Sequence, residues 1–175
     1  WNGLRVHIGP QSHNNPDDRP PTKQYEQARV MGGGSSINGQ LANRGAPTDY
    51  DEWGQLGAAG WSWEACLPYF MKIERDLDFN NEYHGQNGRI PVRRIFQDQW
   101  PEYVKGIASA LEEQGFKYLP DQNGDFKDGY FPVTMSNLYD RRVSAAIGYL
   151  DPQTRRRENL RIESEIQVKE ILFDG

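Results

Sequence analysis

Residues 28–39 of the chain read ARVMGGGSSING, and this stretch says most about what the chain is built to do. Its three consecutive glycines, Gly32 to Gly34, leave the backbone bare. A flat or anionic ligand can therefore lie directly against the peptide N–H groups. Two serines and an asparagine follow at once and add further hydrogen-bonding groups. The stretch predicts a ligand-binding loop.

Other readings of this loop are weaker. A bare Gly-Gly-Gly-Ser-Ser is also typical of a flexible linker. Here an arginine precedes it at position 29, and residues 38–45 (NGQLANRG) continue as structured sequence. No Gly-Lys-Ser or Gly-Lys-Thr follows, so it is not the phosphate loop of nucleotide hydrolases. The pattern is not GxGxxG either, so it is not the opening turn of a dinucleotide-binding unit.

Size and composition narrow the class of protein. The chain has 175 residues, enough for one domain with a core, and carries a net charge of −5 with 36% hydrophobic residues. An acidic balance does not favour nucleic-acid binding. No apolar run reaches the roughly eighteen residues of a membrane-spanning helix. Cys66 is the only cysteine, which excludes an internal disulfide and fits a reducing compartment, so we expect a cytoplasmic location.

Both ends of the sequence indicate an internal fragment. The chain starts at Trp1 with neither an initiator methionine nor a signal-peptide pattern. It stops at Asp174-Gly175, a dipeptide typical of a tight hairpin turn whose return strand would follow. We therefore expect the chain to be a segment of a longer protein.

Periodicity and capping signals predict helices and strands between these ends. Polar, proline-rich residues 10–24 predict a surface loop. The first expected helix runs from Thr48 or Asp49 to Leu56, and the second from its cap Ser62 to Glu74, with a kink or late start at Pro68. The third runs from its cap Asp98 to the stop at Gly115, and the fourth from Ser144 to Leu150. Alternating residues predict strands over 89–95 and 131–135, and two more within 160–173.

The loop and several later segments together resemble the glucose-methanol-choline (GMC) oxidoreductases, a family of FAD enzymes. The resemblance covers residues 28–175. It includes the family's first signature, from Ala28 to Asp51, and the segments DYDEW (49–53), GWSW (60–63), LPYF (67–70), RVSAA (142–146) and NLRI (159–162). Met31 departs from the usual branched aliphatic residue or tryptophan. Asp140 stands where the family usually has glycine.

The resemblance implies an α+β fold that combines part of an FAD-binding domain of Rossmann-like topology with part of an antiparallel-sheet substrate domain. On this basis residues 1–75 belong to the FAD-binding domain and carry the flavin-contacting loop. Residues 76–158 belong to the substrate domain, and residues 159–175 form strands that return to the FAD-binding domain.

The resemblance also assigns cofactor contacts. It places Gly33, Gly34 and Ser35 against the flavin, mostly through backbone groups, and Asn38 and Gly39 near the isoalloxazine and ribityl chain. It places the backbone of Val168 at the adenine, although Val168 by itself reads as a core strand residue. Some members carry a flavin-linked histidine at the position of Ile37, whose side chain has no nucleophilic atom, so non-covalent FAD is expected here.

Neither a catalytic residue nor a metal ligand is expected in this chain. In the family, the GxGxxG turn and the acidic residue that binds the adenosine ribose would precede Trp1. The catalytic histidine, with its histidine or asparagine partner, would lie far beyond Gly175. The three histidines, His7, His13 and His84, stand in polar, loop-like sequence and read as solvated surface residues.

The implied reaction of the whole protein is oxidation of the CH–OH group of an alcohol by hydride transfer to flavin. The expected partners are a small-molecule alcohol and the remaining segments of the parent chain, while this fragment alone is expected to be inactive. Two alternatives stay open. One is a lyase of the same family, similar to hydroxynitrile lyase, which keeps FAD without net oxidation. The other is a non-enzymatic interaction module whose Gly-Ser loop binds no cofactor.

Overall fold

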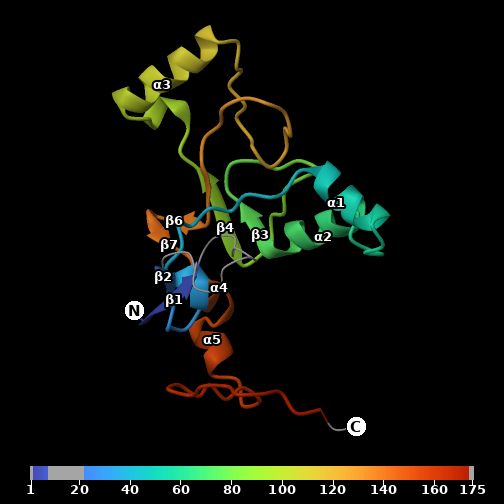
Figure 1. Cartoon of the computed structure of the whole chain (residues 1–175), viewed down its shortest axis with the longest axis vertical. Helices are drawn as coiled ribbons and strands as arrows, with labels where there is room; N and C mark the ends of the chain where they lie inside the picture. Colours follow the sequence, from blue (N-terminus) through green and yellow to red (C-terminus); the bar gives the residue numbers. More distant parts are fainter. Residues whose placement is uncertain (1, 8–21, 174–175) are drawn as a thin grey trace, which may run out of the picture.

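The computed structural model describes residues 2–7 and 22–173 (Figure 1). Within them the secondary structure runs β1 (Asn2–His7), β2 (Thr22–Gln27), η1 (Gly33–Ser36), α1 (Pro47–Gln55), α2 (Trp63–Ile73), β3 (Glu74–Asp76), β4 (Ile90–Arg94), η2 (Gln97–Gln99), α3 (Glu102–Glu113), β5 (Thr134–Met135), β6 (Asn137–Leu138), β7 (Arg141–Arg142), α4 (Ala145–Tyr149) and α5 (Pro152–Arg155). Short sheets and helices are mixed, which is consistent with an α+β chain.

An antiparallel pair, β1 with β2, leads into the glycine loop. Asn2 lies opposite Gln27 and His7 opposite Thr22. The predicted loop over residues 10–24 overlaps β2 at residues 22–24, where the structure has a strand. The rest of that predicted loop, His13 and the predicted turn at Asp174-Gly175 fall outside the described residues.

Helices α1 and α2 pack against each other through aromatic side chains. Tyr50 of α1 lies 5.7 Å from Trp63 and 5.6 Å from Phe70, both of α2, between ring centroids. Helix α1 begins at Pro47, earlier than the sequence predicts, because the Asp49 carboxylate reaches back to accept from the Ala46 N–H. The Ser62 cap on α2 is confirmed, and the helix continues through Pro68 without a late start.

A three-stranded sheet with the order β3-β4-β5 lies at the centre of the chain (Figure 1). Strand β3 follows α2 directly and runs parallel to β4, while β5 is antiparallel to β4. The strand predicted over 131–135 is shorter than expected, and its faces are reversed. Thr134 is fully buried, whereas Phe131 and Val133 are exposed.

Helix α3 begins after Pro101, not at Asp98, and ends before the left-handed Gly115 as predicted. It stands apart from the other helices (Figure 1). Its inner face borders an apolar groove of about 340 Å³, whose other wall includes Tyr130, Phe131 and Val133.

Strand β6 pairs with β7 in a tight hairpin that leads to α4 and α5. The Ser144 cap on α4 is confirmed, since its hydroxyl accepts from the Ile147 N–H. Beyond α5 the described residues to 173 contain no strand, in contrast to the prediction for 160–173. Strands need a hydrogen-bonding neighbour, and none in the described chain lies beside this tail. Its apolar residues Ile166, Ile171 and Phe173 are exposed.

Polar and charged residues make up much of the interior. The buried apolar residues of the described chain are Val92, Ala108, Leu119, Tyr130, Val143 and Ala146, together with the prolines Pro91 and Pro132. The buried polar or charged ones are Glu74, Asp76, His84, Arg94, Asp121, Asn123, Thr134, Asn137 and Ser144. A polar network therefore holds the centre together. Among the described residues, no helix has the length and apolar character needed to cross a membrane.

Candidate functional site

The glycine loop is a one-turn 3₁₀ helix, η1, entered through left-handed backbone. Gly32 has φ 92° and Gly33 has φ 55°, a region that side-chain-bearing residues rarely adopt. A Cβ atom on Gly32 would also lie 2.5 Å from the Ser36 hydroxyl and 3.1 Å from the Ala146 side chain. The fold of this chain therefore itself requires glycine at position 32.

Gly34 and Gly39 differ from Gly32 in this respect. Both are exposed, and neither has a positive φ. A Cβ on Gly34 would meet no atom within 4 Å, and one on Gly39 would make only an ordinary contact of 3.8 Å with Leu41. Nothing in the described chain demands glycine at these two positions. They leave open backbone, which suits a flat group that approaches from outside the chain.

The hydroxyls of the two loop serines are bonded to the backbone of this chain. Ser35 Oγ donates to the Gly32 carbonyl at 2.6 Å and accepts from the Ala145 N–H at 2.9 Å. Ser36 Oγ donates to the Met31 carbonyl at 2.8 Å. Ser35 can therefore meet a ligand through its backbone, as the sequence predicts, while its hydroxyl fastens the loop to the start of α4.

Asn38 closes the loop and is held by two donors. Its side-chain oxygen accepts from the Gln40 N–H at 3.0 Å and from Arg142 Nη1 at 2.9 Å. The same Arg142 nitrogen donates to the Ser35 carbonyl at 3.1 Å. Strand β7, more than a hundred residues further along the chain, thus positions the predicted cofactor-binding loop.

The segment after the loop joins the central sheet. The Ala42 N–H donates to the Thr134 carbonyl at 2.9 Å, and the Ser136 N–H donates to the Gln40 carbonyl at 2.8 Å. The buried Asn123 amide clamps the next residues, since it donates to the Ala42 carbonyl at 2.9 Å and accepts from the Arg44 N–H at 3.0 Å. The loop is therefore anchored at both ends.

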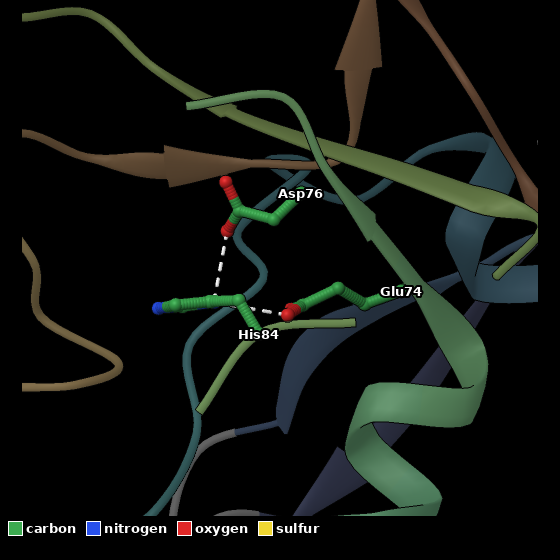
Figure 2. A group of neighbouring side chains, drawn as sticks. All are labelled: Glu74, Asp76 and His84. Atoms are coloured by element: carbon green, nitrogen blue, oxygen red, sulfur yellow. Dashed lines mark hydrogen bonds and ion pairs between the residues drawn. The ribbon is translucent and has the colours of Figure 1, made fainter. Parts of the chain in front are cut away.

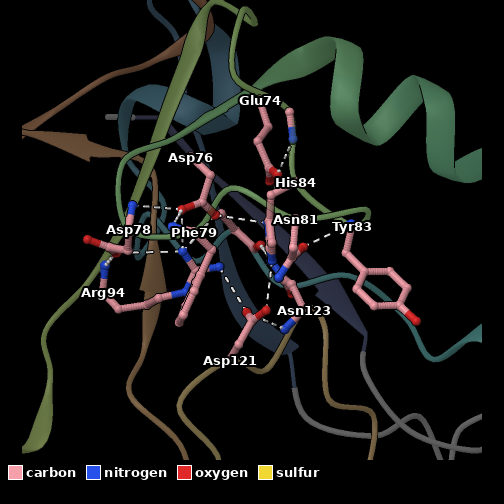
Figure 3. A network of polar contacts seen from close by, with 12 residues as sticks. Glu74, Asp76, Asp78, Phe79, Asn81, Tyr83, His84, Arg94, Asp121 and Asn123 are labelled. Carbon is pink, nitrogen blue, oxygen red and sulfur yellow. Dashed lines mark hydrogen bonds and ion pairs between the residues drawn. The ribbon is translucent and has the colours of Figure 1, made fainter.

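A buried charge network lies beneath this anchor, with His84 at its centre (Figure 2, Figure 3). His84 Nδ1 donates to Glu74 Oε1 at 2.9 Å and lies 2.9 Å from Asp76 Oδ2. On the other side of the ring, Nε2 donates to Asp121 Oδ2 at 2.7 Å. Both ring nitrogens face carboxylates, so both carry protons and the imidazole is positively charged.

Two arginines complete the network. Arg94 Nη1 lies 2.8 Å and 2.6 Å from the two Asp76 carboxylate oxygens, and Arg94 Nη2 lies 3.0 Å from Asp121 Oδ1. The guanidinium also stacks over the Phe79 ring at 4.6 Å. Arg44 Nη2 lies 2.7 Å from Glu74 Oε1. Three buried carboxylates are thus matched by three cations.

The electrostatics follow from this pairing. Burial alone would lower the pKa of His84, but its hydrogen bonds to Asp121, Asp76 and Glu74 outweigh burial and raise that pKa to about 10. Burial alone would raise the pKa of Asp76, and the bonds from His84 and Arg94 instead hold it well below its usual range. The pKa of Asp121 is lowered in the same way.

Glu74, Asp76 and His84 also place potential metal-ligand atoms within 4.8 Å of one another (Figure 2). The imidazole, however, donates through both nitrogens, and a metal ligand would need a lone pair there. Arg44 and Arg94 already neutralise the carboxylates. The geometry describes an ion-pair network that needs no metal ion to balance its charges.

The sequence-based prediction of His84 as a surface residue is wrong, because the residue is 2% exposed. Its neighbours are polar, but they are the partners that allow it to be buried. One signal in the sequence could have found the network. Acids at 74 and 76 alternate directly after a helix, and such spacing places both on one face of a strand.

Val168 lies elsewhere. It belongs to the tail beyond α5, is 76% exposed and is part of no strand. The structure therefore brings Gly33, Gly34, Ser35, Asn38 and Gly39 together in one loop but does not bring Val168 to them.

Comparisons with known proteins show which family the chain belongs to. Residues 21–175 match the family described as GMC oxidoreductase. This chain belongs to the GMC oxidoreductase family. It is 42% identical over its whole length to 5-(hydroxymethyl)furfural oxidase of Methylovorus sp. (strain MP688), and covers 33% of that protein. It is 32% identical over 85% of its length to an oxygen-dependent choline dehydrogenase of Vibrio vulnificus, and covers 26% of it.

Among solved structures, this GMC chain is similar to pyridoxine 4-oxidase from Mesorbium loti, with a TM-score of 0.75 and 26% identity. The match covers 82% of this chain and 28% of the oxidase. A fungal aryl-alcohol oxidase matches with a TM-score of 0.61 and 25% identity over 86% of this chain and 30% of that one. The chain thus spans about a third or less of the length of these relatives.

Proposed function

We propose that this chain is the flavin-contacting segment of an FAD-dependent oxidoreductase that oxidises the CH–OH group of a small alcohol. The observation that carries the proposal is the open backbone at Gly34 and Gly39, in a loop that is otherwise tightly anchored. A rigid loop with a bare outer face suits a flat cofactor, and membership of the family indicates that this cofactor is FAD.

In this proposal the contacts to FAD come from Gly33, Gly34, Ser35, Asn38 and Gly39, with the glycines and Ser35 using backbone groups. Val168 is assigned to the adenine on the family resemblance alone, through its backbone. The FAD is bound without a covalent link, because Ile37 offers no nucleophile. Residues 1–75 then belong to the Rossmann-like FAD-binding domain and 76–158 to the substrate domain. Residues 159–175 return to the first domain, and they form strands there only if other parts of the whole protein supply the partner strands.

FAD, when bound, supplies the hydride acceptor for oxidation of the alcohol carbon. In this proposal the described residues of the glycine loop hold and orient it. His84 is the only histidine whose side chain the structure describes, and carboxylates occupy both of its ring nitrogens. On the family resemblance we assign removal of the alcohol proton to a catalytic histidine expected beyond Gly175, and not to His84.

The relatives suggest a substrate class. A 42% identical relative is named for 5-(hydroxymethyl)furfural and another, at 32%, for choline. We propose a small hydroxymethyl-substituted ring compound as the alcohol, since the more similar relative acts on one by name.

The test uses the full-length protein that carries this chain. Purified protein is expected to be yellow, and its flavin absorbance is expected to bleach when 5-(hydroxymethyl)furfural is added without oxygen, more readily than with choline. Yellow protein that no alcohol bleaches would favour a lyase of the family. Colourless protein that takes up no added FAD would favour a non-enzymatic module.

A further inference from the structure

We infer that Arg142 is a positioning residue of the flavin loop, and that it fixes Asn38 as a hydrogen-bond donor toward the ligand. The inference rests on the proposed function. It adds two roles that the glycine pattern does not predict: Arg142 positions the loop, and Asn38 donates a hydrogen bond to the ligand. Arg142 acts through the loop and is not placed against the reacting atoms.

The orientation of Asn38 follows from its partners. The Gln40 N–H and the Arg142 guanidinium can only donate, so the side-chain atom that faces them both is the carbonyl oxygen. The remaining side-chain group is therefore the NH₂, which can only donate, and the residue is exposed. Whatever contacts the outer side of Asn38 must present an acceptor, such as a hydroxyl oxygen, a carbonyl oxygen or an alkoxide.

The hairpin β6–β7 places Arg142. Its turn residues Tyr139 and Asp140 have φ 50° and 56°, the left-handed pair of a tight two-residue turn. Aspartate tolerates this conformation, so the turn forms although the family usually has glycine there. Arg142 then lies opposite Asn137, whose amide donates to Gln40 Oε1 at 3.0 Å. Arg142 and Asn137 therefore both bond to residues at the C-terminal end of the loop, Asn38 and Gln40 respectively.

The positive charge of Arg142 also supports a role at the ligand-binding face. Among the described side chains no carboxylate lies within ion-pair distance of Arg142, whereas neighbouring Arg93 pairs with Asp140 at 3.0 Å. Arg142 is half-buried, and its guanidinium donates to neutral oxygens of Ser35 and Asn38 as its hydrogen-bond partners among the described residues. A cation kept this close to the open face of the loop favours ligand groups that carry or develop negative charge.

The test compares Arg142→Ala with Arg141→Ala in the full-length apoprotein, using FAD titration and thermal unfolding. Arg141 is the matched control, because it is an exposed arginine in the same strand. Arg142→Ala is expected to weaken FAD binding about tenfold, the size of a lost charged hydrogen bond. Arg141→Ala is expected to change it less than about twofold. Arg142→Lys should bind FAD more tightly than Arg142→Ala and more weakly than the wild type. Lysine keeps the positive charge but lacks the planar set of N–H donors of the guanidinium.

A second variant keeps the inference testable if Arg142→Ala does not fold. Asn38→Asp keeps the oxygen that accepts from Gln40 and Arg142, and replaces the outward NH₂ by a second acceptor. It is expected to keep the thermal midpoint and the wild-type rate of hydrogen exchange at the Gln40 amide, yet to weaken FAD binding by more than about tenfold.

The outcomes separate the two proposals. Wild-type FAD affinity in Arg142→Ala or in Asn38→Asp would overturn the inference and leave the proposed function standing. Absence of FAD binding in the wild type and in Arg141→Ala alike would overturn the proposed function and the inference with it.

Discussion

His84 Nε2 and Asp121 Oδ2 lie 2.7 Å apart in the interior, although 37 positions separate the two residues. Figure 3 shows the ring between Asp121 on one side and Glu74 with Asp76 on the other. The pair joins the segment after α2 to the segment after α3. Because Asn123 follows Asp121 and clamps the residues after the glycine loop, this one contact links the charge network to the candidate cofactor site.

Removal of His84 is expected to be strongly destabilising. In His84→Ala the carboxylates of Glu74, Asp76 and Asp121 lose a buried cation, and breaking such a network typically costs about 3–5 kcal/mol. Urea unfolding followed by tryptophan fluorescence measures the loss. The control is Lys105→Ala, which removes an exposed pair with Glu102 and should cost at most about 1 kcal/mol. Equal stability of the two variants would contradict a structural role for His84.

The stability should fall at alkaline pH through the same group. The pKa of His84 is about 10 in the folded chain, above its ordinary value of 6.5. Its contribution is therefore complete below pH 6.5 and is lost as the pH rises through 10. Asp76 acts in the opposite direction, because its pKa is lowered from 3.8, so its contribution is present above that pH and fades in acid.

Urea midpoints measured at intervals between about pH 5 and 10 check this expectation. The wild type should lose stability steadily over the upper half of that range, and His84→Ala should lose much less there. Tyr118 and Tyr130 also have a raised pKa, so they ionise later and contribute at the alkaline end in both proteins. A wild-type curve as flat as that of the variant would show that His84 is not charged when folded.

Local signals predicted the parts of the fold that local chemistry decides. Ser62 and Ser144 cap their helices, Gly115 follows α3, and the strand predicted over 89–95 is present as β4. Each of these outcomes depends on a few neighbouring residues, which a single sequence displays directly.

The parts of the fold that the sequence does not predict depend on contacts between residues far apart in the chain. His84 stands in polar sequence and becomes buried because Gly85 lets the chain pass close to α2. A Cβ on Gly85 would lie 1.8 Å from the Met71 carbonyl. Its compensating charges come from segments up to forty residues away, which periodicity cannot reveal. The strands predicted over 160–173 had the right alternation, but the described chain offers them no partner strand.

Glycine substitutions separate fold from ligand binding in the loop. Gly34→Ala should leave stability unchanged within about 0.5 kcal/mol, because its Cβ meets nothing within 4 Å, and should weaken FAD binding in the full-length protein. Gly32→Ala should destabilise the chain, because it combines φ 92° with contacts to Ser36 and Ala146. Thermal unfolding and FAD titration of both variants check this. A Gly34→Ala protein that binds FAD normally would remove the loop from the cofactor site.

The 175-residue chain by itself should show no turnover. Both ring nitrogens of His84 are hydrogen-bonded to carboxylates. The chain also covers only 33% of the length of 5-(hydroxymethyl)furfural oxidase, to which it is 42% identical. Steady-state assays with 5-(hydroxymethyl)furfural, choline, added FAD and an artificial electron acceptor should remain at background. FAD-dependent oxidation by the pure chain would show that a catalytic group lies within these residues after all.

The flavin of the whole protein should be released by acid. Ile37 follows η1 directly, at the position where some family members carry a flavin-linked histidine, and its side chain offers no nucleophile. Cys66 is the only thiol of the chain and lies within α2, away from the loop. Acid precipitation of the full-length protein should therefore leave the yellow colour in the supernatant. As a matched test, Ile37→His introduces a nucleophile there without changing the glycines. Yellow colour that stays with the wild-type pellet, on a peptide between Arg29 and Arg44, would contradict binding by hydrogen bonds and packing alone.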